Sequence, residues 1–144
     1  MAGFLGTKAS FTADLAVVLT WIFGAAAVLG AVNGRRRRFN RHCPVMAVSG
    51  LLNWIPVLMI MIPRWLGVVV GGQPLPGSGS VLSAVGHGVL GGTAQLLITY
   101  TAVRMYRLEE LPPRKPIWLM RITFVFWLLS ILGGTFLYAL LYVI

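Results

Sequence analysis

Four long apolar stretches, separated by short polar gaps, run along this chain of 144 residues. They cover roughly residues 12–34, 44–62, 81–103 and 117–143. Each approaches or exceeds the ~20 apolar residues that a helix needs to cross about 30 Å of hydrocarbon. The pattern therefore predicts an all-α membrane protein, a single domain over residues 1–144 with four transmembrane helices arranged as two hairpins.

The basic residues are distributed unevenly between the gaps. Ten of the twelve lie in or beside the first and third gaps, whereas only Lys8 and Arg64 lie elsewhere. Cytoplasmic loops carry an excess of Lys and Arg, so we expect both termini to be non-cytoplasmic, in a multi-pass protein of the bacterial inner (plasma) membrane. The net charge of +9 is explained by these loop anchors, and we expect no nucleic-acid partner.

Five arginines fill the first gap: Arg35, Arg36, Arg37, Arg38 and Arg41. Any boundary that stops translocation favours this composition, so a topology anchor is the simpler interpretation. Binding of anionic lipid head groups or of an acidic partner is the alternative.

Proline and small residues refine the expected helices. Pro44 suits the first position of the second helix, and Pro56 should kink that helix near mid-membrane because it lacks a backbone N–H. Small residues on the first, third and fourth helices permit close approach of another helix. We expect these faces to dock against the transmembrane helices of a larger complex.

Two amides lie near the centres of their spans, Asn53 in the second and Gln95 in the third. An unpaired amide in hydrocarbon costs several kcal/mol, so each should find a partner on another helix. The structural interpretation is an interhelical hydrogen bond, with a contact between the two amides as one possibility. The functional interpretation is a polar lining for a cofactor, a quinone or a substrate.

His87 is the strongest candidate for a binding residue. Gly91 and Gln95 follow it at steps of four, so a groove should run along one face of the third helix. Intramembrane ionisable residues favour function, here a metal or haem b ligand or a proton-handling group, although a histidine bonded to a carbonyl is also common. His42 lies roughly 20–25 Å away in depth, which excludes one haem held by both histidines within one subunit.

Catalytic chemistry has little support. The carboxylates are Asp14, Glu109 and Glu110, all at membrane edges, and we find no nucleophile–base pair in the sequence. We therefore expect a protein that is not an enzyme.

Several short motifs resemble the small bacterial YozB/CtaM-like membrane family, a domain of unknown function linked to cytochrome c oxidase assembly. The matching segments are Arg41-His42-Cys43-Pro44-Val45-Met46, Gly86-His87, and Trp127 with Gly134 and Tyr138. The similarity spans about residues 41–142. It implies a respiratory membrane context.

Two departures from that family weaken a redox centre. Histidines of the family are replaced here by Met61-Ile62-Pro63-Arg64 and by Arg114-Lys115-Pro116. We expect an accessory or assembly subunit of a respiratory or photosynthetic electron-transfer complex, with membrane lipids and partner helices as its contacts. The alternative is a membrane electron carrier that binds b-type haem or a quinone through His87.

Overall fold

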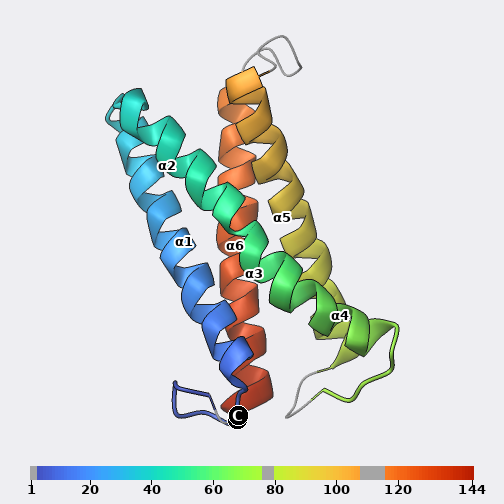
Figure 1. Cartoon of the computed structure of the whole chain (residues 1–144). Helices are drawn as coiled ribbons and strands as arrows, with labels where there is room; N and C mark the ends of the chain where they lie inside the picture. Colours follow the sequence, from blue (N-terminus) through green and yellow to red (C-terminus); the bar gives the residue numbers. More distant parts are fainter. Residues whose placement is uncertain (1–2, 76–79, 108–115) are drawn as a thin grey trace.

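The computed structural model describes residues 3–75, 80–107 and 116–144, and the elements in these ranges are all helices. They are α1 (Phe11–Arg35), α2 (Phe39–Leu52), α3 (Trp54–Pro56), the π-helical segment η1 (Val57–Met61), α4 (Ile62–Val69), α5 (Val81–Arg107) and α6 (Pro116–Tyr142) (Figure 1). Glu109, Glu110, Arg114 and Lys115 lie outside the described residues.

Four helical segments are long and apolar enough to cross a membrane. They are Phe11–Arg35, Phe39–Val69, Val81–Met105 and Ile117–Tyr142. At 1.5 Å per residue the shortest of these measures roughly 38 Å, more than the thickness of the hydrocarbon core. The protein thus has the architecture of a multi-pass, all-helical membrane protein, as the sequence predicted.

The second span differs from the expected 44–62 at both ends. It begins at Phe39, so the prediction that Pro44 occupies the first helical position is wrong. The bond that Pro44 cannot donate would go to Asn40, which is exposed, so solvent or lipid head groups can satisfy that carbonyl. The span also continues past Pro63 to Val69, because a proline is tolerated in the first turn of α4.

The regular α-helix of the second span is interrupted around Pro56, where a kink was predicted. The α-helix α2 ends at Leu52, and the chain passes through α3 into the π-helical segment η1 directly after the proline. Pro56 has no N–H to donate to the Leu52 carbonyl, and the next bond, from Val57 N to Asn53 O, is long at 3.4 Å. Single π turns of this kind are rare overall, and many of those known lie at functional sites.

The helices pack into one bundle. Helix α1 lies along α2 and also contacts α6, α5 lies along α6, and α5 contacts both α2 and α4. The core is formed by Ala27, Ile98, Trp127 and Ile131. Both ends of the described chain lie at one end of the bundle, here called the termini end, and the α1–α2 turn with Arg35–Arg38 lies at the other, here called the arginine end (Figure 1).

Several glycines expected to dock partner helices are instead used inside the chain. A Cβ atom on Gly24 would lie 2.6 Å from Cδ1 of Ile131, and one on Gly30 would lie 2.6 Å from Sδ of Met46. Gly34 is covered in the same way by His42. These small residues bring the helices of this chain together, because their missing side chains leave the room that neighbouring side chains fill.

A candidate ligand-binding cavity

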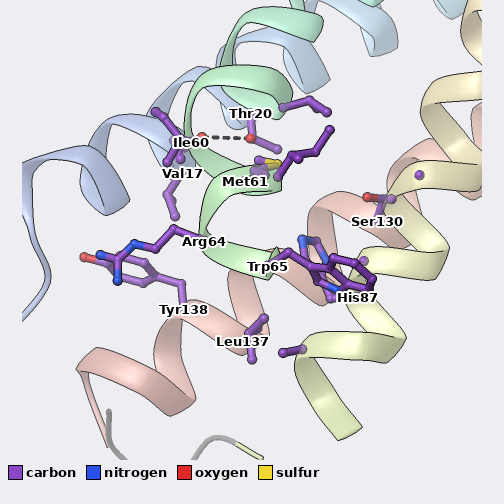
Figure 2. A pocket seen from close by; sticks show the side chains of 18 of the residues that line it. Val17, Thr20, Ile60, Met61, Arg64, Trp65, His87, Ser130, Leu137 and Tyr138 are labelled. Atoms are coloured by element: carbon purple, nitrogen blue, oxygen red, sulfur yellow. Dashed lines mark hydrogen bonds between the residues drawn. The ribbon is translucent and has the colours of Figure 1, made fainter. Parts of the chain in front are cut away.

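A cavity of about 610 Å³ lies between the helices at the termini-end half of the bundle. Its walls come from α1, α5 and α6 and from the interrupted part of the second span, including Val57, Ile60 and Met61 of η1. Figure 2 shows side chains from these elements directed into the same space. The π turn therefore forms part of the wall, and most of the lining is apolar.

The predicted groove on α5 is part of this cavity. His87, Gly91 and Gln95 all line it, as the four-residue spacing indicated. A Cβ atom on Gly91 would lie 3.1 Å from Oγ of Ser130, so α5 and α6 are close at this level. The sequence thus identified one wall of the cavity but not the elements that face it.

Two amides close the deep end of the cavity. Nδ2 of Asn53 donates to Oε1 of Gln95 at 2.8 Å, and Nε2 of Gln95 donates to the Gly50 carbonyl at 2.9 Å. Both residues are buried. The predicted interhelical amide bond is confirmed, and it joins α5 to the second span where α2 ends.

Three buried polar side-chain atoms in the described part of the chain have no hydrogen-bond partner in the protein: Asn53 Oδ1, Trp65 Nε1 and His87 Nδ1. All three belong to residues that line the cavity. An unsatisfied buried polar group costs about 1–3 kcal/mol, so each of the three calls for an explanation. The residues that line the cavity thus carry a donor at Trp65, an acceptor at Asn53, and a ring nitrogen at His87 that serves as either.

Two glycines make room for the unsatisfied nitrogens. A Cβ atom on Gly134 of α6 would lie 2.9 Å from Cε1 of His87, so the imidazole rests against the α6 backbone. A Cβ atom on Gly88 would clash with Nε1 of Trp65, which places the α4 indole against α5 one residue from the histidine. As predicted, His87 faces protein and the cavity rather than open lipid.

Trp65 was not predicted as a site residue. The second span was expected to end at Ile62, which left Trp65 beyond the predicted helix. Extension of the helix to Val69 carries the indole into the cavity wall. No sequence signal distinguished this tryptophan from an interface anchor.

Asp14 forms a second polar cluster at the termini end. Its side chain is fully buried, Oδ2 accepts from the Leu5 backbone N–H at 2.8 Å, and Oδ1 accepts from the Tyr138 hydroxyl at 2.6 Å. The same hydroxyl lies 2.6 Å from Oγ1 of Thr7. Because Tyr138 also lines the cavity, this cluster fixes one wall of it and ties the N-terminal segment to α6.

His42 lies at the arginine end, far from the cavity. Its Nδ1 is 2.8 Å from the Gly30 carbonyl, so the ring donates to α1 and holds the α1–α2 turn. Within the described ranges, no group of three or more His, Cys, Asp or Glu side chains is placed to hold a metal ion. The five arginines of the first gap are all exposed.

No protein-family model matches the chain, and searches of curated proteins and of solved structures find no match either. The resemblance to the YozB/CtaM-like family therefore stays a prediction.

Proposed function

We propose that this chain is a membrane protein that binds a lipophilic molecule of the quinone class in the cavity between its helices. The observation that carries the proposal is the coincidence of an apolar cavity with the three buried polar atoms that lack a partner. The respiratory context expected from the sequence is compatible with such a ligand.

The size and lining of the cavity support a small lipophilic ligand. Ligand sites usually enclose about 300–1,000 Å³, with mostly apolar walls and a few polar groups that fix orientation. This cavity measures about 610 Å³ and meets that description. A water-filled path would need a more polar lining.

The polar atoms support a head group with oxygen acceptors. The Trp65 indole N–H is a donor of the kind that a quinone carbonyl accepts from, and Nδ1 of the neighbouring His87 can donate or accept. A hydroxyl of the reduced ligand is an equally good partner for the histidine. Gly88 and Gly134 keep both rings at the helix backbones, which leaves the cavity to the ligand.

Haem fits less well. His87 lines the cavity, whereas His42 is bonded to Gly30 at the opposite end and cannot supply a second ligand. A haem in this chain would therefore have one protein ligand or require a histidine from another chain. The absorption spectrum of the purified protein distinguishes the two ligands, because only a haem gives a Soret band.

Quinone binding is tested by titrating the protein in detergent with a short-chain quinone and counting retained ligand by mass spectrometry. Val17→Trp places a large ring at the cavity wall and should abolish saturable retention. Val28→Trp, on an exposed face of the same helix, is the matched control and should bind normally. Retention by the wild type no greater than by empty micelles would refute the proposal.

Our second proposal is that the chain acts as a non-enzymatic accessory or assembly subunit of an electron-transfer complex. The small-residue faces support this proposal less than expected, because Gly24, Gly30 and Gly34 pack within the chain. Gly86 and Gly92 are still open to a partner helix, since a Cβ atom on either would have no neighbour within 4 Å. Co-purification in mild detergent followed by mass spectrometry tests this function, and recovery of the chain alone would count against it.

We also propose that the termini end faces away from the cytoplasm in a bacterial inner membrane. The positive-inside bias of the arginine end supports this orientation. In a Cys43→Ser background, Lys8→Cys should react with an impermeant thiol reagent in intact cells, and Asn40→Cys only after lysis. Both positions are exposed, and the reverse labelling would overturn the orientation.

A further inference from the structure

A second hollow lies on the outer side of the α1–α2 pair. Any function of this hollow does not depend on the quinone proposal. It is an open apolar groove of about 430 Å³. Its walls include Ile22 and Ala26 from α1 and Pro44, Val48 and Leu52 from α2. Ile22 and Val48 are each 55% exposed, so this groove faces the surrounding lipid.

The groove ends next to the arginine cluster. Pro44 follows Arg41 by three residues on α2, so the two lie on the same face of the helix about one turn apart. Arg41 and Arg35–Arg38 are all exposed at that end. An apolar groove and a group of guanidinium groups thus meet at one edge of the bundle.

We propose that this groove is a binding site for one anionic phospholipid. An acyl chain lies along the groove, and the phosphate is bound by the arginines at its end. Arginine suits the phosphate because its planar guanidinium forms paired hydrogen bonds to the oxygens.

The dimensions of the groove agree with this occupant. From Pro44 to Leu52 the wall spans eight helical steps, or roughly 12 Å along the helix. One leaflet contributes about 15 Å of hydrocarbon, half of the ~30 Å core. The groove therefore begins near the head-group level and follows an acyl chain through most of a single leaflet.

The first gap carries five arginines with no acidic residue among them, which suits a lipid phosphate. The one carboxylate side chain in the described ranges, Asp14, is buried at the termini end and bonded to Tyr138. It cannot neutralise the arginines across the bundle. An acidic protein would also complement the charge, but it would not account for an apolar groove open to lipid beside it.

The experiment uses the full chain in detergent, stripped of lipid and titrated with phosphatidylglycerol or phosphatidylcholine of identical acyl chains. Native mass spectrometry reports the affinity of the first bound lipid. We expect phosphatidylglycerol to bind at least tenfold more tightly. Each basic residue near an anionic surface contributes about a fivefold factor, so Arg36→Gln, Arg38→Gln and Arg41→Gln together should weaken phosphatidylglycerol binding on the order of 100-fold and leave phosphatidylcholine unchanged. Arg64→Gln, at the other end, is the charge control.

The second part of the experiment fills the groove with a large side chain. Ala26→Trp should weaken both lipids, whereas Val28→Trp on the same helix should weaken neither. Equal affinity of the wild type for the two lipids would overturn the proposal and leave the arginines as a topology anchor. Unchanged binding by Ala26→Trp would overturn it as well, even if the triple variant fails to fold. Loss of an acidic protein partner in the triple variant, with phosphatidylglycerol preference retained, would assign the arginines to that partner instead.

Discussion

The two histidines of the chain lie at opposite ends of the bundle and meet different surroundings. Each ring rests against a glycine of a neighbouring helix, since a Cβ atom on Gly34 would lie 2.9 Å from Nδ1 of His42 and one on Gly134 would lie 2.9 Å from Cε1 of His87. Nδ1 of His42 reaches the Gly30 carbonyl at 2.8 Å. Nδ1 of His87 is buried without a protein partner, in a residue that lines the cavity.

The path of the second span explains this difference. At the arginine end α1 and α2 lie close together, and Figure 1 shows the second span diverging from α1 toward the termini end. The interruption at Asn53 and Pro56 and the π turn η1 lie where the two separate. Small residues therefore close the bundle at one end, whereas at the other they form the wall of a cavity.

The largest expected effect comes from substituting valine for the glycine against which each histidine ring packs, Gly34 for His42 and Gly134 for His87. Gly34→Val should cost about 1–3 kcal/mol, because overpacking a filled contact forces side chains and backbone to shift. Gly134→Val should cost less than about 1 kcal/mol, since His87 can move into the adjacent cavity. Unfolding in mixed SDS micelles measures both variants, and equal costs would contradict the proposed difference between the two ends.

The second prediction concerns ligand affinity. His87→Phe should weaken quinone binding about tenfold, because one hydrogen bond of the head group is lost, whereas His42→Phe should leave it unchanged. Trp65→Phe removes the indole donor and should weaken quinone binding about as much as His87→Phe does. The titration described above measures all three. A loss in His42→Phe equal to that in His87→Phe would mean that global structure, not the cavity, controls binding.

A third prediction tests the Asn53–Gln95 contact, which lies between the arginine-end and termini-end halves of the bundle. Gln95→Leu should cost about 0.6–2 kcal/mol in unfolding free energy, the range for interhelical hydrogen bonds in membranes. Asn53→Leu should cost less on its own, and the double variant should be less destabilised than the sum, because both changes remove the same bond. Full additivity would show that the contact contributes nothing to stability.

The sequence predicted the features that depend on local composition. Span number follows from apolar length, the interruption follows from the missing N–H of Pro56, and the Asn53–Gln95 contact follows from the cost of an unpaired amide in lipid. His87, Gly91 and Gln95 were placed on one face because helical periodicity fixes spacing within a single helix.

The features that depend on tertiary neighbours could not be predicted. Trp65 joins the cavity only because the second span continues beyond Pro63, and Tyr138 reaches Asp14 across 124 positions of sequence. Gly24, Gly30 and Gly34 were expected to pack against partner helices, whereas they pack against side chains of this chain. Composition indicates that a helix face permits close approach, and only the fold determines which helix occupies it.

The smallest expected effect is on the unfolding free energy, which phenylalanine at His42 should lower and phenylalanine at His87 should leave unchanged or raise. His42→Phe should lower the unfolding free energy by about 0.5–1.5 kcal/mol, because the bond to the Gly30 carbonyl is lost. His87→Phe should be neutral or stabilising in ligand-free protein, because it replaces an unpaired buried nitrogen with an apolar edge of similar shape. Binding sites commonly retain such groups at a cost in stability, since the polar atom that destabilises the free protein is the one that orients the ligand. Unfolding in mixed SDS micelles without ligand measures both variants. Destabilisation of His87→Phe as large as that of His42→Phe would show that His87 already has a structural partner, and the case for a ligand at this histidine would fail.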